Sequence, residues 1–264
     1  MGKIAIISGS GKLPETIAKE LINQNNEVYI IGLTNFAHPS LKNLTPYYFE
    51  VKLGQVKKMI DILTKNRIKK VILAGKVEHI NIFKDIKPDK FALSIINKLK
   101  SKNPSSIFDT IKEFLKTFSI ELLRYDQILS DIIPDKTILS GKIGKKIKKD
   151  IEFGYQIAKE IAKMGIGQSV AVKEGVILAV EGIEGTDKMI ERTGKYADDF
   201  TIVKVSMPDH DMRFDIPVVG LDTVKNIKNN GGKALAIESK KTIILDFVKV
   251  MEYCKKTKLI LVAI

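Results

Sequence analysis

Cysteine and tryptophan are the scarcest residues of this 264-residue chain, which has one cysteine, Cys254, and no tryptophan. A single cysteine excludes an internal disulfide framework and a zinc site built on clustered cysteines, in agreement with a reducing compartment. The histidines His38, His79 and His210 are far apart in the sequence and match no zinc-binding spacing. We therefore expect neither disulfides nor zinc, and we expect Cys254 to lie in the last helix and pack into the core.

Long apolar runs are also missing. No stretch of 18 or more apolar residues occurs, and the start MGKIAIISGSGKLP has too short an apolar run and no cleavage pattern for a signal peptide. We therefore expect a cytoplasmic protein. The hydrophobic content of 44% is enough for two domains of ordinary size, each with its own core.

Negative charge is in short supply, because 44 basic residues face 31 acidic ones and the formal net charge is +13. This charge would attract anionic partners such as phosphorylated metabolites, nucleic acid or an anionic membrane surface. Most of the excess is lysine on helix faces, which is typical of a solvated surface. Against that background an arginine marks a place that needs a planar, two-pronged donor. The chain has four arginines: Arg67, Arg124, Arg192 and Arg213.

The first half alternates apolar runs with helix-like stretches. The runs at 3–8, 27–33 and 70–74 are rich in β-branched residues and lack period-two alternation, which indicates parallel strands covered by helices on both faces. This pattern predicts an α/β fold, with a Rossmann-like N-terminal domain over residues 1–133. We expect its helices at 14–24, 55–65, 90–100 and 105–117, and a further short strand at 120–123.

A change in composition marks the predicted domain boundary, where the segment IIPDKTILSGKIG contains a proline and two glycines. Residues 134–264 are predicted to form a second α/β domain, which we expect to carry the catalytic residues. We expect its helices at 145–164, 186–193, 222–229 and 247–255, and its strands at 168–173, 175–180, 201–205, 234–238, 242–245 and 259–264.

The segment SGSGKLPET follows the first predicted strand and opens the first helix, where free backbone N–H groups favour an anion. Gly9 and Gly11 form half of a dinucleotide-binding fingerprint, but Pro14 replaces its third glycine. The second strand also ends without the acid that binds a ribose hydroxyl. A nicotinamide site is thus not expected, while a phosphate- or nucleotide-binding turn and an ordinary tight turn both stay open.

Gly75 and Lys76 follow the strand predicted at 70–74. The carboxyl ends of adjacent parallel strands share one crevice, so we expect these residues near Gly9 and Gly11. Lys76 is therefore a candidate phosphate contact, and the alternative is a surface lysine without a ligand.

The loop MPDHDMRFDIP, residues 207–217, gathers acids, an imidazole and an arginine. Oxygen-rich clusters of this kind suit Mg²⁺, which usually takes one or two carboxylates and leaves its other positions to water and substrate phosphates. Such carboxylates are also common turn formers. The groups are Asp209, His210, Asp211, Arg213 and Asp215.

A second group of carboxylates stands in VEGIEGTDKMIER, directly after a buried strand. Glycines let the backbone bend tightly there, and Thr186 or Asp187 is placed to cap the next helix. A helix cap would account for Asp187 but not for Glu181. Together with Glu184, these acids and the 207–217 loop indicate a metal-assisted site at the strand ends of the second domain.

Two long motifs carry a resemblance to a known family. The stretch GIGQSVAVKEGVILAVEGIEGTDKMIER (165–192) and the stretch DHDMRFDIPVVGLDTV (209–224) resemble two blocks of the LpxI-type UDP-2,3-diacylglucosamine pyrophosphatases of lipid A biosynthesis. SGSGKLP and AGKV with IKPD are similar to that family in the first half. His210 stands where the family usually has glutamine.

The resemblance implies two α/β domains, Mg²⁺ as cofactor, and hydrolysis of UDP-2,3-diacylglucosamine to UMP and 2,3-diacylglucosamine 1-phosphate. It also implies that the aspartate of the R-x-D-x-P motif, Asp215, is required for catalysis. Direct attack of water on one phosphorus is the mechanism we expect, since phosphoryl transfer depends mainly on positioning and charge neutralisation. A homodimer is left open, and the basic surface is expected to help the protein sit on the inner membrane surface.

The candidate residues follow from these arguments. We take Asp215 and Arg213 as catalytic candidates. The candidate metal ligands are Asp215, Asp211, Glu181, Glu184 and Asp187. The candidate substrate contacts are Gly9, Gly11, Lys76, Gln168, Thr186, Arg192 and Lys204.

Two other functions compete with this interpretation. A basic nucleic-acid-binding protein would interleave basic residues with exposed aromatics in a known module, but aromatics make up 7% of the chain and no such module is visible. A non-catalytic sugar-nucleotide-binding protein of the same fold is the other alternative.

Overall fold

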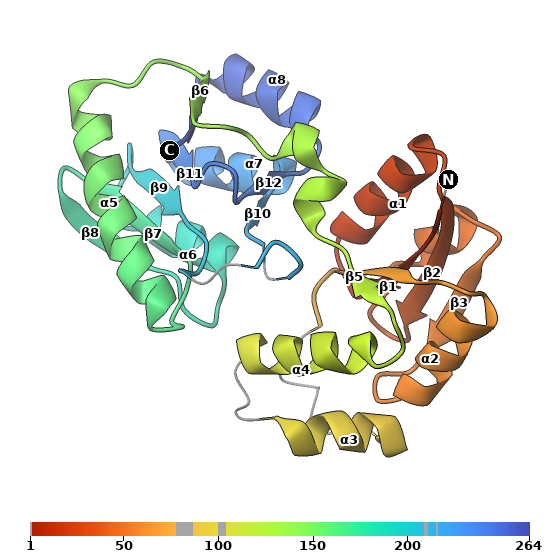
Figure 1. Cartoon of the computed structure of the whole chain (residues 1–264). Helices are drawn as coiled ribbons and strands as arrows, with labels where there is room; N and C mark the ends of the chain where they lie inside the picture. The colour runs from red at the N-terminus through yellow and green to blue at the C-terminus, as the bar shows by residue number, and fades with distance from the viewer. Residues whose placement is uncertain (1, 78–86, 100–103, 209–210, 215) are drawn as a thin grey trace. The chain divides into compact units, whose positions relative to one another are not determined.

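The computed structural model describes residues 2–77, 87–99, 104–208, 211–214 and 216–264. The chain divides into two compact units, Met1–Ile128 and Leu129–Ile264, and each is described by itself (Figure 1). Within the described part of the chain, no helix is long and apolar enough to cross a membrane.

The first unit is built on a five-stranded sheet in the order β3-β2-β1-β4-β5. Every neighbouring pair in this sheet is parallel. Strands β1, β2 and β4 lie at its centre and are almost fully buried, which explains their uninterrupted apolar sequences. The α/β class with a Rossmann-like parallel sheet is therefore confirmed. The strands are β1 (Lys3–Ser8), β2 (Glu27–Leu33), β3 (Tyr48–Val51), β4 (Lys70–Ala74) and β5 (Glu121–Leu122).

Helices cover both faces of this sheet. Helix α1 connects β1 to β2, whereas α2 connects β3 back to β4 in the opposite direction, so right-handed crossovers place the two helices on opposite faces. Figure 1 shows this separation, with α3 and α4 on the side of α2. The helices are α1 (Leu13–Asn23), α2 (Val56–Lys65), α3 (Lys90–Lys98) and α4 (Pro104–Lys116), with short 3₁₀ turns at Pro39–Asn43 and Tyr125–Gln127.

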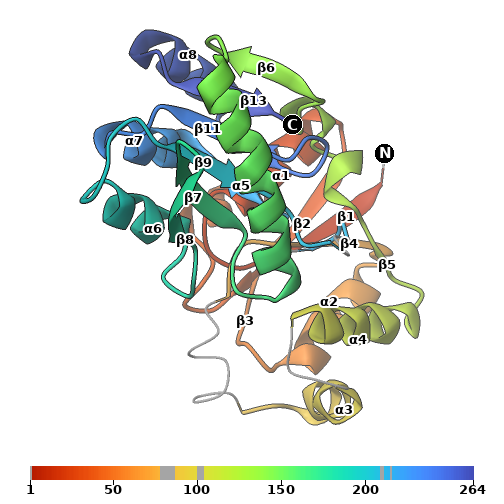
Figure 2. The same ribbon diagram turned by 90° about the vertical axis from the view of Figure 1, so that its left-hand side faces the viewer.

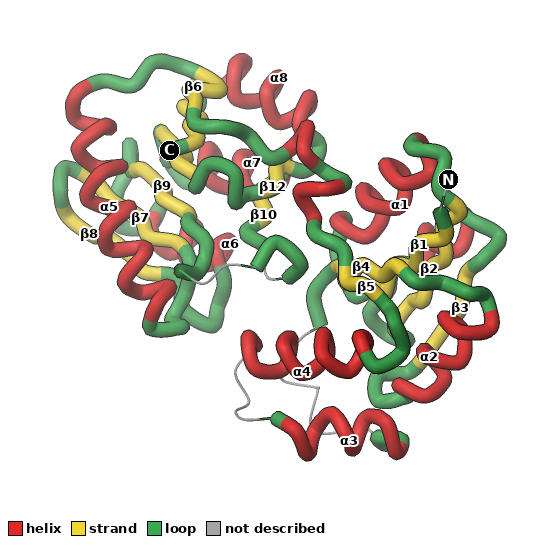
Figure 3. The backbone as a smooth tube through the Cα atoms, in the orientation of Figure 1, coloured by secondary structure: helices red, strands yellow, loops and turns green. Residues whose placement is uncertain are grey.

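The second unit has a six-stranded mixed sheet in the order β6-β13-β11-β9-β7-β8. Strands β9, β11 and β13 run parallel at the centre, and antiparallel strands flank them on both sides. Two short strands, β10 (Val218–Val219) and β12 (Ile243–Ile244), pair separately (Figure 3). The six strands are β6 (Thr137–Ser140), β7 (Ser169–Lys173), β8 (Val176–Val180), β9 (Thr201–Lys204), β11 (Ala234–Ile237) and β13 (Ile260–Ala263).

One long helix covers one face of this sheet and three shorter helices cover the other. Helix α5 (Lys145–Lys163) packs Ile151, Ala158 and Ile161 onto Val170 and Val203. On the opposite face a second apolar layer joins the sheet to the other three helices, and buried Cys254 belongs to it as expected. Figure 2 shows α5 in front of the strands, with α6 (Thr186–Thr193), α7 (Leu221–Asn229) and α8 (Phe247–Thr257) on the other side.

The alternating directions bring several strand ends to one edge of the second sheet. Strand β8 is antiparallel to β7, which is antiparallel to β9, so β8 ends at the same edge as β9 and β11. In open α/β sheets ligands bind outside the carboxyl ends of the strands. We call this side, where Glu181, Lys204 and Glu238 lie, the carboxyl edge of the second sheet.

Candidate functional site

The glycine turn of the first unit lies against the segment that follows β4. The Gly9 N–H donates to the Ala74 carbonyl at 2.8 Å, and Ser10 and Lys76 exchange backbone hydrogen bonds of 2.8 and 2.9 Å. A Cβ atom at Gly9 would lie 2.4 Å from the Lys76 carbonyl oxygen, so the turn needs glycine. The predicted proximity of Lys76 to Gly9 is thus confirmed, whereas its contact with a phosphate stays a prediction.

The carboxyl edge of the second sheet holds a buried charged cluster, which we call the Lys204 cluster: Ser169, Glu181, Thr186 and Lys204. The Lys204 Nζ donates to Thr186 Oγ1 at 2.8 Å and to Ser169 Oγ at 3.2 Å, and lies 3.8 Å from Glu181 Oε2. Thr186 in turn donates to Glu181 Oε1 at 2.7 Å. The side chains of Lys204 and Glu181 are 9% and 13% exposed. Two opposite charges are therefore held together almost out of water.

The local field keeps Glu181 ionised. Burial by itself would raise its pKa, but Lys204, the Ser169 and Thr186 hydroxyls and the Gln168 N–H together lower the pKa below its ordinary value. The Gln168 N–H donates to Glu181 Oε2 at 3.2 Å. The result is a carboxylate that orients the lysine and the threonine at the strand end.

Two loops meet at this cluster. A Cβ atom at Gly167 would lie 2.1 Å from the Glu181 carbonyl oxygen, so the loop before β7 can approach the loop after β8 only with glycine there. Helix α6 begins after Gly185, which has φ +82° and caps the helix without a side-chain hydrogen bond. The expectation that Thr186 or Asp187 caps this helix was therefore wrong, because the Thr186 hydroxyl is used by Glu181 and Lys204 instead.

The other predicted acids of this segment also have protein partners. Arg192 donates to Glu184 Oε1 at 2.7 Å and to the Val180 carbonyl at 3.0 Å, and this hydrogen bond from Arg192 lowers the pKa of Glu184. Asp187 is exposed, and its backbone carbonyl accepts a hydrogen bond of 3.0 Å from the Asn226 amide. Arg192 thus fixes the loop between β8 and α6, with its guanidinium at the surface.

The 207–217 loop is described in part. Arg213 Nη1 donates to Asp211 Oδ2 at 2.8 Å, and the Arg213 N–H donates to Asp211 Oδ1 at 3.0 Å. Both side chains are about one quarter exposed, at 28% and 25%. Asp209, His210 and the predicted catalytic residue Asp215 lie outside the described residues.

The sequence analysis missed a second buried network at the same edge. Glu238 follows β11 and accepts hydrogen bonds from the Ser206 N–H at 2.8 Å, from Lys241 at 2.9 Å and from Lys159 at 3.1 Å. Lys159 also donates to the Ser206 carbonyl at 2.9 Å, which fixes the start of the loop that leads to Arg213. Burial tends to raise the pKa of Glu238, yet Lys241, the Ser206 N–H and Lys159 lower it overall. An acid directly after a buried strand was the available signal.

Both units match one protein family. The chain matches the LpxI N-terminal domain over residues 3–132 and the LpxI C-terminal domain over residues 134–262. The chain belongs to the LpxI family. A curated relative, the UDP-2,3-diacylglucosamine pyrophosphatase LpxI of Caulobacter vibrioides, is 26% identical over 93% of this chain and 91% of its own length.

Similarity to a solved structure outside the LpxI family is slight. A structure of glycinamide-RNase-transformylase T from Mycobacterium tuberculosis aligns with 68% of this chain and 44% of its own, at 10% identity and a TM-score of 0.27. The chain spans less than half of that protein, and a similarity at this level carries no functional argument.

Whether this LpxI chain can bind Mg²⁺ depends on which of its carboxylates are available as ligands. Among the residues that the structure describes, no three His, Cys, Asp or Glu side chains gather in a group that could hold a metal ion. Glu181, Glu184 and Asp211 each contact a basic side chain. A magnesium site with one or two carboxylates is compatible with this arrangement, because substrate phosphates and water supply the other ligands. Metal binding by the predicted acids stays a prediction.

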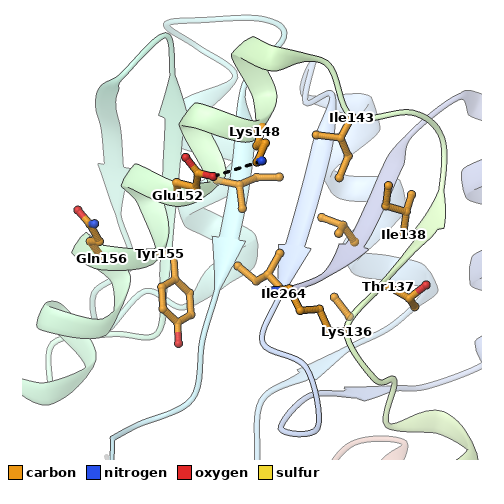
Figure 4. Close-up of a pocket in the computed structure, with 12 residues that line it drawn as sticks. Lys136, Thr137, Ile138, Ile143, Lys148, Glu152, Tyr155, Gln156 and Ile264 are labelled. Atoms are coloured by element: carbon orange, nitrogen blue, oxygen red, sulfur yellow. Dashed lines mark ion pairs between the residues drawn. The ribbon is translucent and has the colours of Figure 1, made fainter.

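An open hollow of about 740 Å³ lies in the second unit, on the face of the sheet beside α5. Figure 4 shows Ile138, Ile143 and Ile264 on its strand side and Tyr155 on its helix side, with the Lys148–Glu152 ion pair along α5. Its lining carries neither the Lys204 cluster nor the Asp211–Arg213 pair. The hollow is therefore separate from the candidate site.

Proposed function

We propose that this protein hydrolyses UDP-2,3-diacylglucosamine to UMP and 2,3-diacylglucosamine 1-phosphate, with Mg²⁺, in lipid A biosynthesis. The observation that carries the proposal is the match of both halves of the chain to the two LpxI domains. The relative from Caulobacter vibrioides is named for this pyrophosphatase activity and aligns over nearly the whole chain. In this proposal the protein is a hydrolase that cleaves a phosphorus anhydride, the diphosphate of the sugar nucleotide.

The carboxyl edge of the second sheet supports the binding of a diphosphate. Lys204, Arg192 and Arg213 all lie on segments that end at or follow strands β8 and β9. Cationic groups near such an edge can donate charge-assisted hydrogen bonds to phosphate oxygens. Thr186 and Gln168 lie beside Lys204 and are proposed substrate contacts. Because the buried Glu181 holds Lys204 in place, the lysine is positioned before any substrate arrives.

Asp215 has the central catalytic role in this proposal. It stands in the sequence R-x-D-x-P of residues 213–217, the motif whose aspartate the family resemblance makes essential. Asp215 and Asp211 would hold the Mg²⁺, which when bound supplies charge neutralisation on the phosphate oxygens. Asp215 would also orient the attacking water, while Arg213 stabilises the charge that develops on the phosphoryl oxygens.

The glycine turn of the first unit is proposed to hold the nucleotide or its phosphates. Gly9 and Gly11 lie between the end of β1 and the first turn of α1, and Lys76 follows the end of the adjacent strand β4. Backbone N–H groups at a helix start favour anions, and Lys76 adds a positive charge. No role for nucleic acid is proposed.

The decisive experiment measures UMP release from UDP-2,3-diacylglucosamine by the purified protein. We expect activity with Mg²⁺, loss of activity with EDTA, and a drop of at least about a hundredfold for Asp215→Ala, comparable to the loss of other electrostatic groups in active sites. Asp135→Ala is the matched control, because Asp135 is an 80% exposed aspartate of the same unit that pairs with Lys240. Its activity should equal that of the wild-type protein.

The absence of UMP with the wild-type protein and Mg²⁺ would contradict the proposal. Titration calorimetry with UDP-2,3-diacylglucosamine would then test the alternative, a sugar-nucleotide-binding protein without turnover. Activity that survives EDTA would contradict the magnesium requirement alone and leave the hydrolase in place.

A further inference from the structure

Helix α3 exposes apolar side chains on its outer face. Leu93 and Ile96 are 45% and 48% exposed, and residues three apart lie on the same side of a helix. Phe91 points to another side of the helix and contacts Phe114 and Phe118 of the α4 region, with ring centroids 5.8 and 5.9 Å away, while Ala92 is buried at the edge of the strip. The helix therefore has one side fixed to the unit and one apolar strip in solvent.

Positive charge borders this strip toward the start of the helix. Lys87 and Lys90 are exposed, Lys90 lies three residues before Leu93, and Asp89 is the single acid between residues 87 and 99. The carboxylate of Asp89 is already used by backbone groups: Oδ1 accepts from the Phe91 and Ala92 N–H groups, at 3.0 and 2.9 Å. The outer face thus presents two aliphatic side chains next to exposed lysines.

The same aspartate attaches α3 to the functional edge of the first sheet. Asp89 Oδ2 accepts from the Lys57 N–H at 2.7 Å at the start of α2, and the Asp89 N–H donates to the Gly54 carbonyl at 3.1 Å. Helix α2 begins at the carboxyl ends of the strands, the edge that also carries Gly9 and Lys76. Figures 1 and 2 show α3 outside α4, farther from the sheet.

We propose that the outer face of α3 docks on the surface of an anionic lipid bilayer. Leu93 and Ile96 enter the boundary between head groups and acyl chains, and Lys87 and Lys90 lie at the lipid phosphates. The proposal rests on the proposed function, since a diacylated sugar nucleotide resides in a membrane. It adds the surface through which the protein reaches that membrane.

Charge alone does not mark this surface, as the densest lysine run shows. Lys145–Lys149 begins α5, but the isoleucine in that run, Ile147, packs against the core on the sheet side. That run therefore offers positive charge without an apolar strip. Helix α3 combines both features, and this combination favours a bilayer over a simple polyanion.

The test is co-sedimentation of the full-length protein with vesicles that contain no substrate. We expect binding to vesicles of phosphatidylglycerol and phosphatidylcholine, and little binding to pure phosphatidylcholine. Leu93→Ser with Ile96→Ser, and separately Lys87→Glu with Lys90→Glu, should weaken binding at least about tenfold. Far-UV circular dichroism and the melting temperature show that each variant is folded.

Matched controls distinguish binding through the outer face of α3 from a general effect of exposed apolar residues or of net charge. Ile22→Ser with Val248→Ser removes two apolar side chains that are 38% and 68% exposed on other helices. Lys145→Glu with Lys149→Glu makes the same charge change on α5. Both control proteins should bind anionic vesicles like the wild-type protein, and equal losses in these controls would overturn the proposal.

Kinetics distinguish a bilayer from the substrate itself as the ligand of α3. The α3 variants should hydrolyse substrate in detergent micelles normally and show a raised KM when the substrate is presented in anionic vesicles. Unchanged vesicle binding with a raised KM in micelles would mean that α3 contacts the substrate acyl chains, and would overturn bilayer docking. Vesicle binding needs no turnover, so its outcome is independent of whether the proposed hydrolysis is correct.

Discussion

Lys204 and Glu181 form a buried pair in which each charge stabilises the other. Removing one partner of such a pair leaves the other charged in a poorly solvated place, which typically costs about 3–5 kcal/mol. Lys204→Met should therefore lower the free energy of unfolding by about that amount in urea titrations. Lys233→Met is the matched control, because Lys233 forms a half-exposed pair with Asp199 at 3.7 Å. A control that loses as much as the variant would contradict the argument.

The contribution of Glu181 to stability should also depend on pH. Its pKa is lowered in the folded protein, so the stabilisation is present above the ordinary carboxyl pKa and is lost as the pH falls through the lowered value. Glu181→Gln should therefore be less stable than the wild-type protein at pH 7, and the difference should shrink as the pH falls below the ordinary carboxyl pKa. Melting temperatures across this range measure it. A difference that stays constant would show that Glu181 acts by packing alone.

Some of these buried residues could be predicted from the sequence, and others could not. Glu181 was named because it follows a predicted buried strand, and Lys204 because its charge suits a phosphate, but no local pattern pairs the two with each other. Glu238 and Lys159 were missed, because their partnership depends on contacts between α5 and a strand 79 residues away in the chain. Pairings of this kind follow from sheet order, which local patterns do not specify.

At the scale of elements, the turn after β1 leaves no room for a side chain at Gly9. Gly9→Ala would place a methyl group 2.4 Å from the Lys76 carbonyl oxygen, a backbone atom that cannot simply rotate away. We expect a loss of about 1–3 kcal/mol in unfolding free energy, in the range of other overpacking substitutions. Gly2→Ala is the matched control in the same unit, since its Cβ would meet its nearest neighbour at 3.8 Å. Equal stability of the two variants would contradict this.

Strongly patterned elements were predictable, and three short strands without such a pattern were not. Strands β1, β2, β4 and β8 and helix α6 agree with their predicted bounds to within one residue. Strands β3, β6 and β10 were not predicted, because their sequences are short and carry few buried apolar residues. Each is held by hydrogen bonds to a strand elsewhere in the chain, and that tertiary contribution is invisible in a local window.

At the scale of the whole molecule, each unit has its own sheet and its own buried apolar layers. Residues 129–264 expressed alone should therefore fold and unfold in one cooperative transition, since both core layers of that sheet come from within the unit. Circular dichroism and urea titration would test this. A fragment without a cooperative transition would show that the second unit depends on the first for its stability.

The two-domain organisation and the family were both accessible from sequence, because the motifs at 165–192 and 209–224 are long and ordered. The surface proposed for membrane docking was not, since it depends on the arrangement of side chains in space. The position of Leu93 and Ile96 on an outer helix face, for instance, needed the packing of Phe91 to define which side faces inward.

The lone thiol of the chain has a practical consequence. Cys254 is fully buried in α8, and burial raises its pKa to about 11. At neutral pH it should be inert toward maleimides while the protein is folded. A cysteine introduced on α3 could then carry a fluorophore without any prior removal of native thiols, and an environment-sensitive dye there would report contact with lipid in real time. In urea, reaction of Cys254 itself would report the opening of the last helix.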